Sequence, residues 1–110
     1  MQMEPKVVAI PATSINSEAT LYTPTSGKRF RIVGGQVACS VAGVATLKDN
    51  PAGTTILVVG CDVAHKMVTL SDLLSKSGKG AGILSAAADN VLTGQGINGN
   101  FYGYLLVHEE

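Results

Sequence analysis

The fold is decided by residues 29–47, which read RFRIVGGQVACSVAGVATL. Apolar and polar side chains alternate along this stretch, as in a strand that buries one face. The alternation changes phase once, at a pair of glycines, and its apolar residues move from even to odd positions: Phe30 and Ile32, then Val37, Cys39 and Val41. One extra residue in a β-bulge produces such a shift and keeps the apolar side on the core. We therefore expect a bent strand with a bulge near Gly34 and Gly35.

The type of turn after this strand can be predicted from the residues that each turn would place opposite each other. A three-residue loop over Val41, Ala42 and Gly43, with Gly43 in the left-handed conformation, sets apolar residues of the two strands opposite each other. A two-residue turn instead sets Cys39 against Thr46. Because paired apolar residues stabilise a sheet, we expect a hairpin with the three-residue loop.

The rest of the chain consists of short extended runs separated by turn residues. We expect further strands at residues 6–10, 19–23, 54–59, 66–70, 91–93 and 100–107, and one helical turn at residues 85–89. In the last strand the odd positions, beginning with Phe101, are expected to face inward. Short strands without a long helix predict an all-β fold, a jelly-roll-like antiparallel β-sandwich. We divide the chain into an extended N-terminal arm, residues 1–19, and a β-sandwich domain, residues 20–110.

The composition indicates a weakly charged surface. Charged residues make up 15% of the 110 residues and the formal net charge is zero, against a charged share of about 25% in ordinary domains. Such a surface suits a subunit that covers much of its exterior with partners. It gives no electrostatic reason to expect binding to nucleic acid or to an anionic membrane. Without an apolar run of about 20 residues or a signal peptide, we expect the mature protein to begin near Met1 and to fold in the cytoplasm.

The two cysteines, Cys39 and Cys61, lie far apart in the sequence and form no CxxC motif. Both have small apolar neighbours, and an unpaired cysteine commonly behaves as a small hydrophobe. We expect two buried free thiols.

No catalytic motif is complete. Residues 94–99 match GxGxxG, but a strand rather than a helix is expected to follow, and no acidic residue lies about 20 positions later. Residues 78–80 lack the first glycine and the Ser or Thr of a phosphate-binding loop. A closely spaced histidine pair with a following glutamate, typical of metal-dependent cupins, is also missing from the sequence. We therefore expect no enzymatic activity, no catalytic residue and no cofactor.

A metal site has one candidate group of residues, Cys61, Asp62 and His65. Zinc needs three or four ligands, and the second histidine of the chain is His108, near the other end. The simpler interpretation is a loop with one buried thiol and two solvated polar residues, so we expect no metal.

The basic residues of the chain cluster at Lys28, Arg29 and Arg31. On an alternating strand Arg29 and Arg31 share one face, where they could bind an acidic partner or a phosphate. The alternative is a solvated charged face.

Three stretches have a family resemblance: residues 21–32, which read LYTPTSGKRFRI, residues 44–56, and residues 82–92, which read GILSAAADNVL. Together they are similar to the small jelly-roll capsid decoration proteins of tailed bacteriophages, also called cement or staple proteins.

The resemblance implies a virion structural protein, made in the host cytoplasm and placed on the capsid exterior. Its partners would be the major capsid protein, whose subunits it bridges, and further copies of itself in a dimer or trimer. The N-terminal arm would contact the capsid or a neighbouring subunit, with Val7, Val8 and Ile10 as anchors, by adding a strand to a sheet edge.

The alternative is a receptor- or glycan-binding domain of a phage head or tail fibre. Its binding residues would lie in two loops, residues 62–65 and 94–100, with the tyrosines Tyr22, Tyr102 and Tyr104 as candidate platforms. A third class, a small-molecule or metal enzyme, has no motif in its favour.

Overall fold

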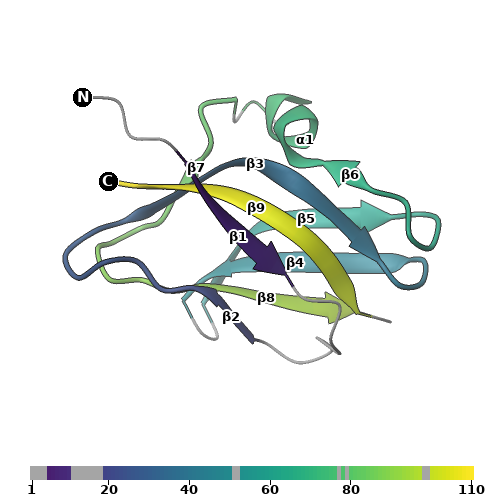
Figure 1. The fold of residues 1–110 in the computed structure, drawn as a ribbon, viewed down its shortest axis with the longest axis horizontal. Coiled ribbons are helices and arrows are strands. Elements are labelled where there is room, and N and C mark those ends of the chain that lie inside the picture. The colour runs from purple at the N-terminus through teal and green to yellow at the C-terminus, as the bar shows by residue number, and fades with distance from the viewer. Residues whose placement is uncertain (1–4, 11–18, 51–52, 77, 79, 98–99) are drawn as a thin grey trace.

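The protein is a sandwich of two antiparallel β-sheets in a computed structural model, which describes residues 5–10, 19–50, 53–76, 78, 80–97 and 100–110 (Figure 1). Sheet A has the strand order β1-β9-β3-β6, and a short strand, β7, also pairs with β3. Its strands are β1 Lys6–Ile10, β3 Phe30–Cys39, β6 Val68–Thr69, β7 Ile83–Leu84 and β9 Phe101–Glu109. Sheet B has the order β2-β8-β4-β5. Its strands are β2 Ala19–Tyr22, β4 Gly43–Asp49, β5 Thr54–Cys61 and β8 Leu92–Ile97.

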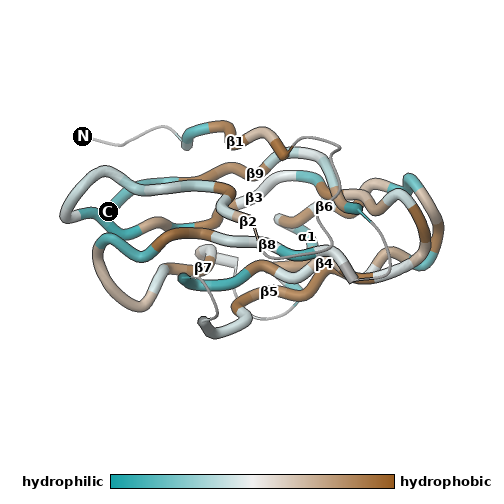
Figure 2. Tube along the Cα trace, turned by 90° about the horizontal axis from the view of Figure 1, so that it is seen from below, coloured by the Kyte–Doolittle hydropathy of each residue, from teal (hydrophilic) through white to brown (hydrophobic). Residues whose placement is uncertain are grey.

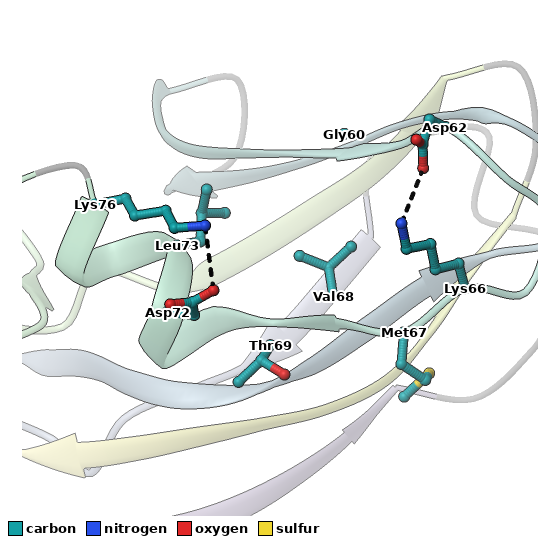
Figure 3. A pocket seen from close by; sticks show the side chains of 9 residues that line it. All are labelled: Gly60, Asp62, Lys66, Met67, Val68, Thr69, Asp72, Leu73 and Lys76. Carbon is teal, nitrogen blue, oxygen red and sulfur yellow. Dashed lines mark ion pairs between the residues drawn. The ribbon is translucent and has the colours of Figure 1, made fainter.

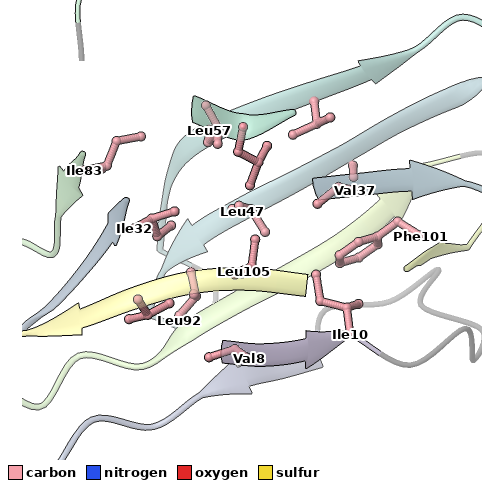
Figure 4. Close-up of a cluster of buried hydrophobic side chains, with 14 of the residues drawn as sticks. Val8, Ile10, Ile32, Val37, Leu47, Leu57, Ile83, Leu92, Phe101 and Leu105 are labelled. Carbon is pink, nitrogen blue, oxygen red and sulfur yellow. The ribbon is translucent and has the colours of Figure 1, made fainter. Parts of the chain in front are cut away.

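The predicted β-sandwich is therefore confirmed. Seen from below, β1, β9 and β3 form one layer and β8, β4 and β5 form the other (Figure 2). Apolar side chains from both layers meet between them, among them Ile32, Leu47, Leu92 and Leu105, none of which is exposed to solvent (Figure 4).

The bulge predicted near the glycine pair is present in β3. Ile32 pairs with Val107 and Gly34 pairs with Leu106, so Val33 is the extra residue. Gly35 has φ of 127°, and a Cβ atom there would lie 2.3 Å from the carbonyl oxygen of Tyr104. A side chain at this position would clash with the neighbouring strand, which explains why the bend is made of glycine.

The predicted hairpin between β3 and β4 is wrong. β3 belongs to sheet A and β4 to sheet B, so residues 40–42 lead the chain from one sheet to the other. Gly43 begins β4 opposite Cys61 and does not have a positive φ. Val41, expected to face inward, is 46% exposed in this connection. The alternation identified the buried face of each strand correctly, but two strands that bury residues in one core can face each other instead of pairing.

The helix lies at a different place from the one expected. α1 spans Leu70–Lys76 and buries Leu70 and Leu74, one turn apart, against β3. Residues 85–89, the expected helical turn, form bends and turns whose alanines are exposed. Packing of leucines against a sheet stabilises the short helix, whereas the helix propensity of three exposed alanines is too weak.

The last strand, β9, lies in the centre of sheet A between β1 and β3. Its odd positions face inward as predicted, and Phe101, Leu105 and Val107 are completely buried. Space for the Phe101 ring comes from Gly94 on β8, where a Cβ atom would lie 2.7 Å from Cζ of Phe101. Gly94, the first glycine of the GxGxxG match at residues 94–99, therefore lies inside the core.

Residues 6–10, assigned from the sequence to an arm, form a strand of the sandwich. β1 pairs with β9 from Lys6 opposite Val107 to Ile10 opposite Gly103. Residues 1–4 and 11–18, the rest of the expected arm apart from Pro5 and Ala19, lie outside the described residues.

Candidate interaction surface

The outward side of sheet A presents an apolar surface. The register places Val7 opposite Leu106 on one side of the sheet, and Tyr104 between Ala9 and Gln36. Directly opposite residues share a face, and the inward residues of β9 are the odd ones, so these side chains point outward together with Tyr102. We call this surface the sheet A face and define it by six residues: Val7, Ala9, Gln36, Tyr102, Tyr104 and Leu106.

None of these six side chains is charged. Val7 is 70% exposed and Tyr104 is 36% exposed, while Tyr102 and Leu106 are half-buried. An uncharged surface that contains tyrosines and aliphatic residues has the composition of the centre of a protein interface.

Polar groups mark both ends of the sheet A face. At one end the hydroxyl of Tyr102 lies 2.6 Å from Nδ1 of His65. The backbone N–H of His65 donates to the carbonyl oxygen of Cys39 at 2.7 Å, which holds the β5–β6 loop against β3. At the other end Arg31 lies opposite His108 and forms an ion pair with Glu110.

The outward side of sheet B has a different composition. The register places Thr46 opposite Gln95, and Thr93 between Thr20 and Lys48. The hydroxyl of Thr46 donates to the carbonyl oxygen of Gln95 at 3.1 Å. We call this surface the sheet B face and define it by six residues: Thr20, Val44, Thr46, Lys48, Val58 and Gln95; Thr93 points to the same side but is buried.

The three predicted anchors of the arm separate into two environments. Val7 lies on the sheet A face, where a partner can reach it. Val8 and Ile10 are 8% and 3% exposed and belong to the protein's own core. The prediction that all three contact a partner is corrected for Val8 and Ile10, because the strand that they were expected to add to a neighbour pairs with β9 of the same chain.

The two arginines of the predicted basic cluster bind carbonyl and carboxylate groups of the protein itself. The guanidinium of Arg29 donates to the carbonyl oxygen of Ser85, at 2.9 Å from Nε. Arg31 pairs with Glu110 and donates from Nη1 to the carbonyl oxygen of Ala81 at 3.2 Å. The hydrogen bond from Arg31 lowers the pKa of Glu110. Lys28 remains exposed at the turn before β3, so the two arginines have intramolecular roles that the alternating pattern did not reveal.

Sequence reasoning missed Glu109, which joins the two sheets. Its carboxylate accepts hydrogen bonds from the Tyr22 hydroxyl, from the backbone N–H of Thr25 at 2.7 Å and from the Thr25 hydroxyl at 2.9 Å. Nζ of Lys6 lies 3.4 Å away, and the Glu109 side chain is 7% exposed. These donors, with Tyr22 the strongest, lower the pKa of Glu109 to about 2. A signal existed, since 109 continues the inward odd positions of β9.

The residues of the fibre alternative are partly brought together. Ser40 and Asn100 exchange hydrogen bonds, the N–H of Ser40 to the Asn100 carbonyl at 2.9 Å and the N–H of Asn100 to the Ser40 hydroxyl at 3.1 Å. Together with His65 they place three loops at one end of the sandwich. Residues 94–97, expected in a loop, are instead part of β8, and residues 98–99 lie outside the described residues. Tyr22, a candidate platform, is bound to Glu109.

A hollow of about 330 Å³ lies between the end of β5 and α1 (Figure 3). Met67, Val68 and Leu73 supply its apolar lining, and two ion pairs flank it, Asp62 with Lys66 at 3.7 Å and Asp72 with Lys76 at 3.4 Å. Each pair is exposed and contributes little to stability, but each neutralises the charges at its end of the hollow.

The cysteines are buried free thiols, as predicted. Cys39 ends β3 in sheet A and Cys61 ends β5 in sheet B. Burial, with a smaller effect of the Cys61 thiol beside it, raises the pKa of Cys39 to about 12. Asp62 pairs with Lys66, and His65 contacts Tyr102. Among the described residues no group of three or more His, Cys, Asp or Glu side chains could hold a metal ion.

The one helix of the described residues has seven residues, and within the described part of the chain no helix is long and apolar enough to cross a membrane. Comparison with family models, with curated proteins and with solved structures finds no match.

Proposed function

We propose that the protein is a virion structural protein that binds the outside of a phage capsid through the sheet A face and stabilises the head by bridging major capsid subunits. The observation that supports this proposal is the uncharged, partly aromatic sheet A face, with Val7 70% exposed beside half-buried Leu106. Exposed apolar patches on otherwise weakly charged proteins mark sites of protein contact.

Two further observations favour a decoration protein. The eight strands other than β7 have the orders β1-β9-β3-β6 and β2-β8-β4-β5, and this arrangement supports the connectivity of a jelly roll. The short strand β7 is an addition that pairs with β3. The resemblance of residues 21–32, 44–56 and 82–92 to decoration proteins supplies the capsid as the partner. On a capsid, many identical contacts act together, so a modest surface on each copy is sufficient.

The test is binding of the purified full chain to heads that lack it. Tyr104→Lys places a charge on the sheet A face, and Thr46→Lys places the same charge on the sheet B face. We expect saturable binding of the parent at a fixed ratio, with greater resistance of the heads to heat. Tyr104→Lys should weaken binding at least about tenfold, and Thr46→Lys should bind like the parent. No binding of the parent, or equal binding of both variants, contradicts the proposal.

A fibre domain that binds a receptor or glycan is the second candidate, and the gathering of the three loops at one end of the sandwich favours it. Binding of the full chain to host-surface glycans, lost in His65→Ala and kept in Tyr104→Lys, would support this alternative. Binding to heads without glycan binding would exclude it.

A further inference from the structure

The edges of the two sheets are protected to very different degrees. A free strand edge presents unpaired N–H and C=O groups, and proteins protect such edges with short strands, charges, prolines or bulges. β1 begins with Lys6 after Pro5, β2 has four residues, and β6 and β7 have two residues each. β5 has eight residues, reads TTILVVGC, and contains neither a charge nor a proline.

One side of β5 pairs with β4, and among the described residues no strand pairs with its other side. A register shift makes Ile56 an extra residue of β5, so regular pairing on the free side is available from Leu57 to Cys61. Val58 projects from this segment on the sheet B face and is 51% exposed. Figure 2 shows β5 as a largely apolar strand at the border of its layer.

We propose that two copies of this chain associate by antiparallel pairing of their β5 strands, with Val59 opposite Val59 of the second copy. In this register each Val58 lies opposite Gly60 of the second copy, on the same face of the joined sheet. Gly60 offers the space, because a Cβ atom there would meet nothing within 4 Å. An exposed side chain on each copy therefore meets an open position on the other, in both directions.

The charges beside β5 permit this contact. β5 itself is uncharged, so a second β5 strand brings no like charge against it. Asp62, which directly follows β5, forms an ion pair with Lys66. The charged residues of β4, Lys48 and Asp49, lie opposite Thr55 and Thr54, outside residues 57–61. Another copy of the same strand therefore meets an uncharged edge. In the hollow that begins at Gly60, the charged residues are paired with each other.

The geometry of such a dimer has a direct consequence. A two-fold axis that relates two antiparallel strands stands perpendicular to the sheet, so both copies keep the same side of sheet B uppermost. Both sheet A faces then point in one direction, and the dimer presents two copies of that surface to a flat partner. A pair of strands this short belongs to the small interfaces, below about 1,200 Å², so we expect a weak dimer in free solution.

Sedimentation equilibrium of the full chain, over concentrations up to about 1 mM, tests the inference without any capsid. We expect a concentration-dependent dimer, and a dissociation constant at least about tenfold higher for Val58→Lys, which places charges at the joined edge. Val63→Lys, at a residue that is 55% exposed outside β5, is the matched control and should dimerise like the parent.

Amide hydrogen exchange provides a second readout that does not depend on a variant. Protection of residues 57–61 should rise with protein concentration, while protection of β2, the opposite edge of sheet B, should not change. A monomer at every concentration, or a dimer that Val58→Lys leaves intact, would overturn the inference. Neither result bears on binding to heads through the sheet A face, which the Tyr104→Lys variant tests separately.

Discussion

The outward faces of the two sheets differ although their inward faces are alike. Ile32 and Leu105 of sheet A and Leu47 and Leu92 of sheet B are all fully buried. On the outside, the sheet A face presents Val7, Tyr104 and Leu106 and no charge, whereas the sheet B face presents threonine, glutamine and Lys48 together with Val44 and the 51% exposed Val58. The apolar inward positions are required by the fold of any sandwich. The outward positions are free to differ, and the lack of charge on the sheet A face, against Lys48 on the sheet B face, is the difference on which the proposed capsid contact rests.

The largest effect is expected for an inward residue of sheet A. Phe101→Ala should lower the free energy of unfolding by about 3 to 5 kcal/mol, because it leaves a cavity under a side chain that is fully buried. Urea denaturation followed by circular dichroism measures this change. Tyr104→Ala, three residues along the same strand and outward, is the control, and an equal loss in both variants would show that the two sides of β9 are wrongly assigned.

A smaller loss of stability is expected at Gly94 of sheet B, which leaves room for the Phe101 ring of sheet A. In Gly94→Ala the added methyl group would lie 2.7 Å from Cζ of Phe101 and 2.8 Å from Cδ1 of Leu21. Such overpacking should destabilise the protein by about 1 to 3 kcal/mol. Gly60→Ala, on the same sheet but with nothing within 4 Å of its Cβ position, should unfold at nearly the parent midpoint. If the two variants have the same midpoint, Phe101 does not pack on Gly94.

The stability that the Glu109 hydrogen bonds between the two sheets contribute should depend on pH. The pKa of Glu109 is lowered to about 2 from its ordinary value of 4.5, so its contribution is complete above pH 4.5 and is lost as the pH falls toward 2. Glu109→Gln should lose about 1 to 2 kcal/mol at neutral pH, since it removes hydrogen bonds to a charged acceptor. The variant should also show a flatter decline of stability between pH 4.5 and pH 2. Parallel pH profiles for parent and variant would rule out this role.

The smallest effect on stability is expected on the sheet A face itself. Val7→Ser changes a side chain that is 70% exposed, so the free energy of unfolding should stay within about 0.5 kcal/mol of the parent. Binding to heads should nevertheless weaken. A large loss of stability in thermal unfolding would mean that Val7 serves the fold and not a partner, and the contrast between the two outward faces would lose its functional meaning.

Local patterns predicted the parts of the fold that depend on which side of a strand is buried. The phase shift at Gly34 predicted the bulge, and the odd positions from Phe101 predicted the inner side of β9. The same patterns did not show which strands pair. β3 was expected beside β4 but pairs with β9, and Val8 and Ile10 were expected on a partner but pack beneath their own sheet.

The other differences between the predicted and the observed structure also arise from contacts between residues that are distant in sequence. α1 is too short to show a clear helical period, and it forms because Leu70 and Leu74 pack on β3. The roles of Arg29 and Arg31 depend on Ser85, Ala81 and Glu110, which lie 50 residues or more away in sequence. The sheet A face could have been anticipated only in part, because its extent depends on the pairing of β1 with β9.

The central place of β9 also bears on how the protein is made. β9 separates β1 from β3 in sheet A, and Lys6 at the start of the chain pairs with Val107. During synthesis, β1 and β3 therefore have no partner strand in their own layer, apart from the short β6 and β7, until residues 101–109 have left the ribosome. Pairing over such sequence separations slows folding, and unpaired strands are open to aggregation while they wait. Most of one layer must be completed by β9, so we expect sheet A to form only after residues 101–109 have been made.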